Sequence, residues 1–193
     1  MINYSSKKGH IITVYSTLIG LSIEKLEKLK EIDISEFIIH LPTLNYLENI
    51  KVNENYLQML EFTKKCISNS TFIVMVKEPQ ILELDNRIKD ILHDITIQSE
   101  LINSRAGNLN NVTVNRKNGI IHCDRNFQSH VLLPNGEISL CCQDFNYQYV
   151  IADLNKDKYM DIYNNKALNE FKTKLKDETA DLLCRFCEYA IHS

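Results

Sequence analysis

The chain contains 193 residues, of which 44% are hydrophobic and 24% charged, a balance that is typical of a folded core and excludes general disorder. With five glycines and three prolines, it is not a collagen-like or linker protein. The net charge of −3 comes from both signs spread along the chain. It provides no basic footprint for phosphate groups, so nucleic acid is not an expected partner.

One stretch near the start loosely resembles a secretory signal, because Lys7 and Lys8 precede the mainly apolar residues 11–21. Three hydroxyl residues interrupt this stretch and no small-residue cleavage site follows, so a buried strand is the better interpretation. No run of about 18 apolar residues is present to span a bilayer. We therefore expect a cytoplasmic protein with no membrane partner, in which the six cysteines stay reduced unless a metal binds them.

The first half of the chain alternates short apolar runs with segments of helical periodicity. The apolar runs predict strands at residues 10–17, 37–41, 72–76 and 95–97. The segments between them predict helices at residues 22–32, 54–67 and 82–93, the first with Ser22 as its N-cap. This alternation is typical of βαβ units around a parallel sheet. Because a complete α/β barrel needs eight strands and about 250 residues, we expect a half barrel or a small open sheet within residues 1–118.

The second half, residues 119–193, follows an Asn-rich stretch at residues 100–122 and has a different pattern. A β-hairpin is predicted over residues 131–142, because the Asn135-Gly136 pair tolerates the positive φ angles of a tight turn. A helix is predicted over residues 158–176. This hairpin-plus-helix unit has few apolar residues of its own to form a core, so it needs a stabilising crosslink such as a metal or a disulfide.

Cysteines can supply that crosslink, since five of the six lie in the second half. Cys184 and Cys187 form a CxxC, a spacing that lets one turn direct two thiolates at one centre. Cys123 and Cys141 lie at the two ends of the hairpin, where antiparallel pairing brings them together. Four such thiolates suit either a [4Fe–4S] cluster or a tetrahedral zinc ion. An odd number of cysteines in a reducing compartment makes disulfides a weaker interpretation.

Only one of the adjacent Cys141 and Cys142 is expected to be a ligand, because successive side chains of a strand point to opposite faces. Cys142 shares the apolar face with Ile138 and Leu140, so we expect Cys141 to be the ligand and Cys142 a packed thiol. Cys66, alone on a predicted helix, is interpreted as an ordinary buried thiol.

The spacing of these cysteines resembles the SPASM/twitch-type auxiliary-cluster domain of radical S-adenosylmethionine (SAM) enzymes. The resemblance lies in Cys123, Gly136, Cys141 and the Cys184–Cys187 pair, with supporting similarity at residues 133–144 and 159–165. It implies that the four cysteines ligate one [4Fe–4S] cluster with no position left open. Six residues follow Cys187, so the single-cluster twitch form is the closer match. The first half resembles the later strands and helices of that family's partial barrel only weakly.

The sequence departs from the family because it contains no CxxxCxxC, the motif that binds the SAM-cleaving cluster, and no glycine-rich acidic motif after it. By this comparison the chain begins near the third strand of the barrel. We therefore expect a fragment, a degenerate relative or one half of a split enzyme that does not cleave SAM by itself. SAM would then bind only with the missing half supplied. Expected partners are a chain supplying that half or an electron donor, and the alternative function is a four-cysteine zinc module with a structural or interaction role.

Charged residues near these positions complete the set of candidates. A [4Fe–4S] core with four thiolates carries a net charge of about −2, which is costly to bury without nearby donors or cations. Arg185, Arg125 and His122 are placed in the sequence to offset it. Other candidates are a loop at residues 104–108 with an anion-capable arginine, and three residues near strand ends, where barrel ligands cluster, namely His40, Lys77 and Glu78.

Overall fold

The computed structural model describes residues 1–43, 47, 49–76, 84–109, 112 and 114–192. The chain divides into two compact units, Met1–Ile102 and Asn103–Ser193. The first unit therefore ends before most of the Asn-rich stretch, whereas the sequence analysis placed the boundary after residue 118. Within the described residues, no helix has both the length and the apolar character required to cross a bilayer.

The first unit is an α/β unit built on a four-stranded parallel sheet, which confirms the predicted alternation. The strands are adjacent in chain order and all neighbouring pairs are parallel. The sheet contains β1 (Thr13–Ser16), β2 (Glu36–His40), β3 (Ser70–Val76) and β4 (Gln98–Leu101), and the helices are α1 (Ile2–Lys7), α2 (Ile23–Lys30), α3 (Glu54–Cys66) and α4 (Asn86–Ile91).

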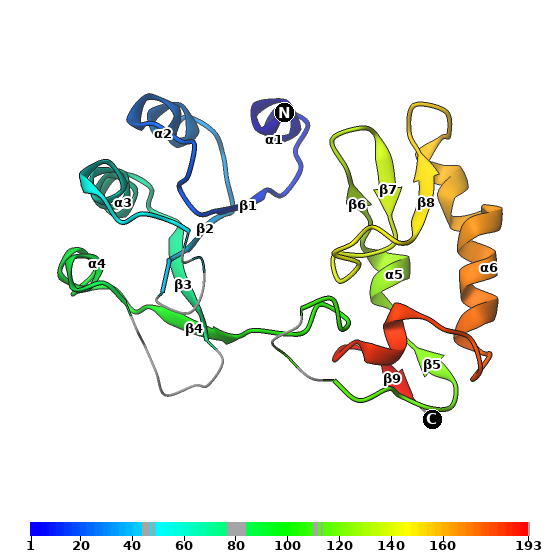
Figure 1. Cartoon of the computed structure of the whole chain (residues 1–193). Helices are drawn as coiled ribbons and strands as arrows, with labels where there is room; N and C mark the ends of the chain where they lie inside the picture. Colours follow the sequence, from blue (N-terminus) through cyan, green and yellow to red (C-terminus); the bar gives the residue numbers. More distant parts are fainter. Residues whose placement is uncertain (44–46, 48, 77–83, 110–111, 113, 193) are drawn as a thin grey trace. The chain divides into compact units, whose positions relative to one another are not determined.

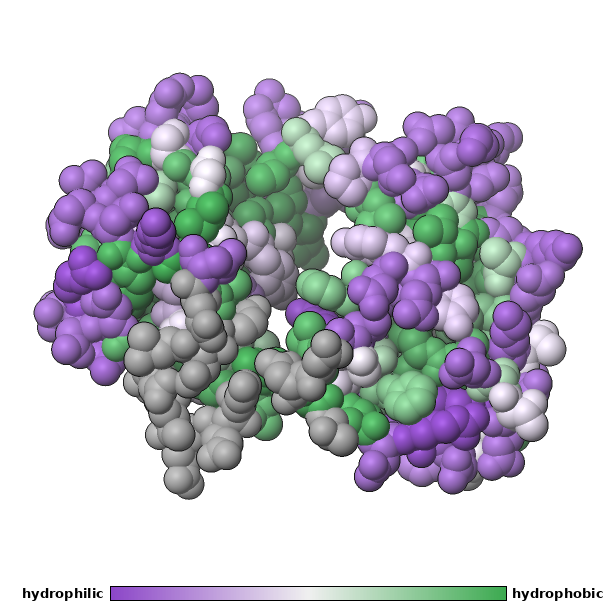
Figure 2. All heavy atoms as spheres, in the orientation of Figure 1, coloured by the Kyte–Doolittle hydropathy of each residue, from purple (hydrophilic) through white to green (hydrophobic). Residues whose placement is uncertain are grey.

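Helices α2, α3 and α4 lie along one side of this sheet (Figure 1). Side chains at their starts satisfy backbone N–H groups that have no partner inside the helix: Ser22 accepts from Lys25, Asn53 from Tyr56 and Asp85 from Arg87. The N-cap predicted at Ser22 is thus confirmed. Alternate sheet residues such as Phe37, Ile39, Phe72 and Val74 pack with these helices into one core. Hydrophilic side chains cover the outer faces of α2 and α3 in Figure 2.

The fourth strand lies further along the chain than predicted. β4 pairs with β3 from Gln98 to Leu101, and its four residues are exposed. The apolar residues at 95–97 precede it: the amide of Ile95 donates to the carbonyl of Leu92 as the chain leaves α4, and Ile97 packs against the core. The prediction was wrong because it assigned this apolar triplet to the strand, whereas the strand itself is a polar edge.

The second unit combines two small antiparallel sheets with a helix. Its elements are β5 (Ile121–His122), α5 (Arg125–Gln128), β6 (Val131–Leu132), β7 (Glu137–Ser139), β8 (Val150–Asp153), the 3₁₀ helices η1 (Tyr159–Asn164) and η2 (Leu183–Phe186), α6 (Lys166–Leu175) and β9 (Ile191–His192). Strands β6, β7 and β8 form one sheet and β5 and β9 the other. Helix α6 lies beside β8 (Figure 1), and buried side chains of both elements belong to a second hydrophobic core.

The helix predicted over residues 158–176 is two helices. Asn165 has extended backbone angles and separates η1 from α6. Its side chain accepts a hydrogen bond from the Leu168 amide at 2.8 Å and donates one to the Ile151 carbonyl at 2.6 Å. Periodicity alone missed this break, because an asparagine that caps a helix fits the polar side of an uninterrupted one.

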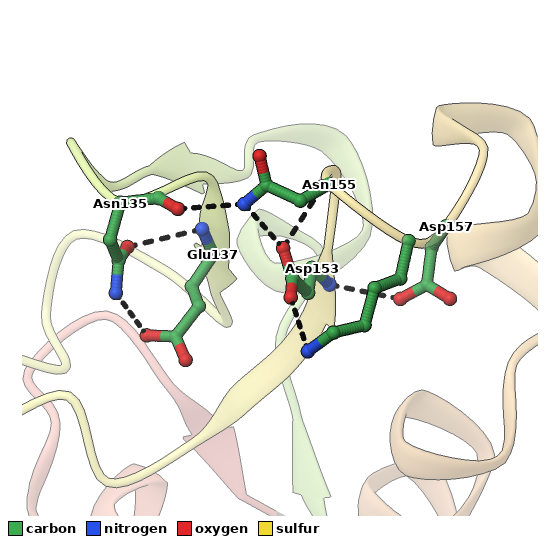
Figure 3. Close-up of polar contacts among 6 residues, drawn as sticks. Asn135, Glu137, Asp153, Asn155 and Asp157 are labelled. Atoms are coloured by element: carbon green, nitrogen blue, oxygen red, sulfur yellow. Dashed lines mark hydrogen bonds and ion pairs between the residues drawn. The ribbon is translucent and has the colours of Figure 1, made fainter.

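The predicted hairpin is confirmed, with β6 and β7 paired and the Gly136 amide donating to the Leu133 carbonyl across the turn. A polar network fixes this turn (Figure 3): the Asn155 side-chain amide donates to the Asn135 carbonyl and to the Asp153 carboxylate, both at 2.8 Å. Gly136 has φ +93°, and a Cβ there would lie 2.3 Å from the Asn155 nitrogen. The turn therefore requires glycine for both backbone and space.

We predict that Gly136→Ala destabilises the second unit by more than the backbone strain of about 1–2 kcal/mol expected for a left-handed residue, because Asn155 must also move. Gly20→Ala is the matched control, since Gly20 has φ +73° with nothing within 4 Å of its added Cβ. Urea denaturation followed by circular dichroism measures both free energies of unfolding. An equal loss in the two variants would contradict the proposed role of the contact with Asn155.

Candidate metal centre

The four cysteines predicted as ligands lie in three separate segments of the second unit. Cys123 directly follows β5, Cys141 follows the end of β7, and Cys184 and Cys187 lie in and just after η2. Strand β5 pairs with β9, so that Ile121 lies opposite His192 and His122 opposite Ile191. This pairing closes the chain around the CxxC and brings the segment of Cys123 beside it. All six cysteines of the chain are free thiols.

Burial and neighbouring thiols both shift the pKa values of these cysteines. Burial raises the pKa of the Cys184 thiol far above its usual range, and the sulfurs of Cys141, Cys123 and Cys187 raise it further. Burial also raises the pKa of Cys187, which interacts with Cys123 in turn. A buried thiol surrounded by other sulfurs is protonated at neutral pH without a metal, so metal binding there must release protons.

Backbone amides also influence two of these thiols. Burial raises the pKa of Cys141 and Cys187, and the nearby amides of Gln143 and Asp144, and of Tyr189 and Ala190, act in the opposite direction. The Asp144 and Ala190 amides themselves donate to the carbonyls of Cys141 and Cys187, at 3.1 and 3.2 Å. Concavities lined by consecutive N–H groups favour anions and recur at iron–sulfur sites. Among the described residues, no group of three or more His, Cys, Asp or Glu side chains is gathered closely enough to hold a single metal ion.

Asp144 fixes the loop that carries Cys141. Its buried carboxylate accepts hydrogen bonds from the amides of Gln148 at 2.9 Å and Tyr149 at 2.8 Å, and its own amide donates to the Cys141 carbonyl. The loop therefore keeps its shape through a charge that is paired with backbone donors rather than with a cation. The sequence analysis missed this residue, because an aspartate after a cysteine pair carries no spacing signal.

The orientation argument for Cys142 was wrong in one respect. Cys142 is exposed, not packed in the core. Strand β7 ends at Ser139, and both Ser139 and Leu140 are buried, so the strict alternation of a strand does not extend to the cysteines. The assignment of Cys141 as the ligand stays a prediction.

Arg185, which the sequence analysis placed as a counter-charge, has another set of contacts. Its guanidinium is completely buried and donates to four backbone carbonyls, at distances from 2.6 to 3.1 Å. The acceptors are Asp177, Ala180, Lys117 and Gly119. Its own carbonyl accepts from the Lys117 amide at 2.8 Å. Arg185 lies within the CxxC, and its hydrogen bonds join the loop before η2 to the segment before β5. The CxxC is therefore held between these two segments.

Two other expected counter-charges also have identifiable surroundings. The Arg125 guanidinium carbon lies 3.8 Å from the centroid of the Tyr189 ring, a stacked cation–π contact with the segment after the CxxC. His122 is an exposed residue of β5. Lys117, which the sequence analysis did not select, donates its ammonium to the carbonyls of Cys187 and Ala190.

The loop at residues 104–108 docks on the CxxC segment. Arg105, Ala106 and Gly107 have φ angles of 51°, 55° and 79°, a left-handed turn that is unfavourable for the first two. The Ser104 hydroxyl accepts from the Gly107 amide at 2.9 Å, and the Ser104 amide donates to the Glu188 carboxylate at 2.5 Å. A Cβ on Gly107 would lie 3.2 Å from the Phe186 side chain. These contacts make the loop a support for the cysteines.

The remaining candidates belong to the first unit. His40 ends β2, is half-buried, and has its ring centroid 6.0 Å from that of Tyr15. Lys77 and Glu78 lie outside the described residues. Cys66 is the last residue of α3 and is half-buried rather than buried.

We predict that Arg185→Lys destabilises the second unit by at least about 3 kcal/mol, because hydrogen bonds to a charged group contribute about 1.5–3 kcal/mol each and a lysine cannot reproduce the planar fork. Chemical denaturation measures the effect, and Arg125→Lys is the control that keeps charge at an exposed position. A role limited to counter-charge predicts that Arg185→Lys is tolerated, so unchanged stability would refute the clamp.

Comparison with known proteins agrees with this geometry. The SPASM family model, described as an iron–sulfur cluster-binding domain, matches residues 123–188. No curated protein matches the chain. A crystal structure of BtrN in complex with AdoMet and 2-DOIA has a TM-score of 0.56 at 15% identity, and the match covers 98% of this chain and 64% of that one. A structure of selenomethionine BtrN in an open conformation has a TM-score of 0.32 at 16% identity, covering 86% of this chain and 76% of that one.

The present chain therefore shares its fold with the AdoMet-bound BtrN structure and spans a little under two thirds of the length of that protein. The matched segment 123–188 contains Cys123, Cys141, Cys184 and Cys187. Residues 123–188 are therefore similar to SPASM iron–sulfur cluster-binding domains.

Proposed function

We propose that the second unit holds a single [4Fe–4S] cluster through Cys123, Cys141, Cys184 and Cys187. The observation that carries this proposal is the match of residues 123–188, which contain all four cysteines, to an iron–sulfur cluster-binding family. Because all four donors are free thiols, the residues present fit such a group by ligand type. Among the described residues they are not gathered around one ion position, so a bound cluster would draw the sulfurs together.

The surroundings suit a buried anionic centre. Cys184 and Cys187 are 5% and 4% exposed, so the sulfurs are held away from water, where unpaired negative charge is costly. Backbone amides near Cys141 and Cys187 offset part of that charge, and the Lys117 ammonium at the Cys187 carbonyl adds a cation. The cluster would supply one-electron transfer and a crosslink between three segments. With four protein ligands, no iron position remains open for a substrate.

We further propose that this chain acts as part of a radical SAM-type enzyme. The support is its fold, which follows that of BtrN over 98% of the chain, together with the SPASM domain. The sequence contains no CxxxCxxC, so the SAM-cleaving cluster would come from a preceding segment or a separate chain. Among the described residues, β1 pairs only with β2, and its other edge is where further barrel strands would add. An electron donor is then a second expected partner.

We predict that anaerobically purified protein is brown and contains about four iron and four sulfide per chain. Cys141→Ser should remove most of the iron, whereas Cys142→Ser, one residue away and exposed, should retain it. Iron and sulfide analysis with visible absorption spectra measures both variants.

Two results would contradict this assignment. A colourless protein with about one zinc per chain would establish the four-cysteine zinc module instead. Greater iron loss from Cys142→Ser than from Cys141→Ser would show that the wrong member of the pair has been assigned.

A further inference from the structure

A pocket in the second unit opens beside one of the four cysteines. It has a volume of about 390 Å³ and lies between the start of β5, α5 and the end of α6. Most of its wall is carbon, from Ile120, Ile121, Phe127 and Leu175. Cys123 also lines the pocket, whereas Cys141, Cys184 and Cys187 do not. The volume falls within the range of small-molecule sites, which are mainly apolar with a few polar groups.

The polar groups of this pocket are mainly cationic. Lys172 and Lys176 line it from α6, and Asp124 provides one carboxylate beside His122. The Lys172 ammonium is half-buried, donates to the Tyr163 carbonyl at 3.3 Å and lies 5.2 Å from the Phe127 ring centroid. This lysine is therefore held in place, whereas Lys176 is exposed at the C-cap of α6 and can reach toward a ligand.

We propose that this pocket binds a planar aromatic anion. Its rings would lie against Phe127, Ile121 and Leu175, and its acidic group would face Lys176 and Lys172. Aromatic and aliphatic walls bury the flat body of such a ligand, and ammonium groups at the rim pair with its charge. The ligand would contact the Cys123 side, so its position next to a cluster rests on the proposed function. The binding itself requires only the pocket.

Anthraquinone-2-sulfonate is a probe with this chemistry, and equilibrium dialysis against the protein as purified measures its Kd. We expect saturable binding with about one site per chain. Lys176→Gln should raise the Kd about twofold to fivefold, the upper part of the range for one exposed ion pair. Ile120→Trp should raise it at least about tenfold by filling the pocket from a position that is 42% exposed, so that folding is preserved.

Lys174→Gln is the matched control, because Lys174 lies on the same helix but lines a different pocket, with Tyr149 and Phe171. It should change the Kd less than twofold. Equal effects of Lys174→Gln and Lys176→Gln, or wild-type binding that does not saturate, would overturn the proposal. Iron and sulfide measured in the same samples separate the two claims: saturable binding without iron refutes the cluster alone, and iron without saturable binding refutes the pocket alone.

Discussion

The second unit depends on the pairing of β5 with β9. This pairing joins the residues just before Cys123 to those just after the CxxC, and it closes a loop of about 70 residues, which is an entropically costly step. Two residue pairs of a short antiparallel ladder cannot offset that cost alone. The buried Arg185, with four carbonyl acceptors, and the Lys117 ammonium add bonds to the same closure.

Closure of this loop also positions the segments that carry the proposed ligands. The β5–β9 pairing holds the segment of Cys123 beside the CxxC, and Asp144 shapes the loop that carries Cys141. The protein thus arranges three backbone segments by hydrogen bonds, and the sulfurs follow from the arrangement. A cluster bound to these sulfurs would crosslink the same three segments and stabilise the folded state by its binding free energy. The hydrogen bonds of the protein and the proposed cluster would therefore stabilise the same contacts between segments.

Much of this could be predicted from the sequence where local rules decide the outcome. The β-branched runs predicted strands and Ser22 predicted the start of a helix, both correctly. These signals are reliable because periodicity and capping act over a few residues. Long-range partners could not be predicted in this way. Three features each depend on a distant backbone group, which no local pattern specifies. They are the polar edge strand β4, the contacts of the Arg185 guanidinium and the docking of residues 104–108. Cys142 was misplaced because the strand ends two residues before Cys141.

The central claim is that four sulfurs meet at one inorganic centre. X-ray absorption at the iron edge of anaerobically purified protein tests it most directly. We predict iron with a first shell of sulfur and, beyond it, an iron–iron scattering shell, which only a multinuclear cluster produces. Absorption at the zinc edge with a sulfur shell alone, or no metal and sulfurs joined in pairs, would contradict it.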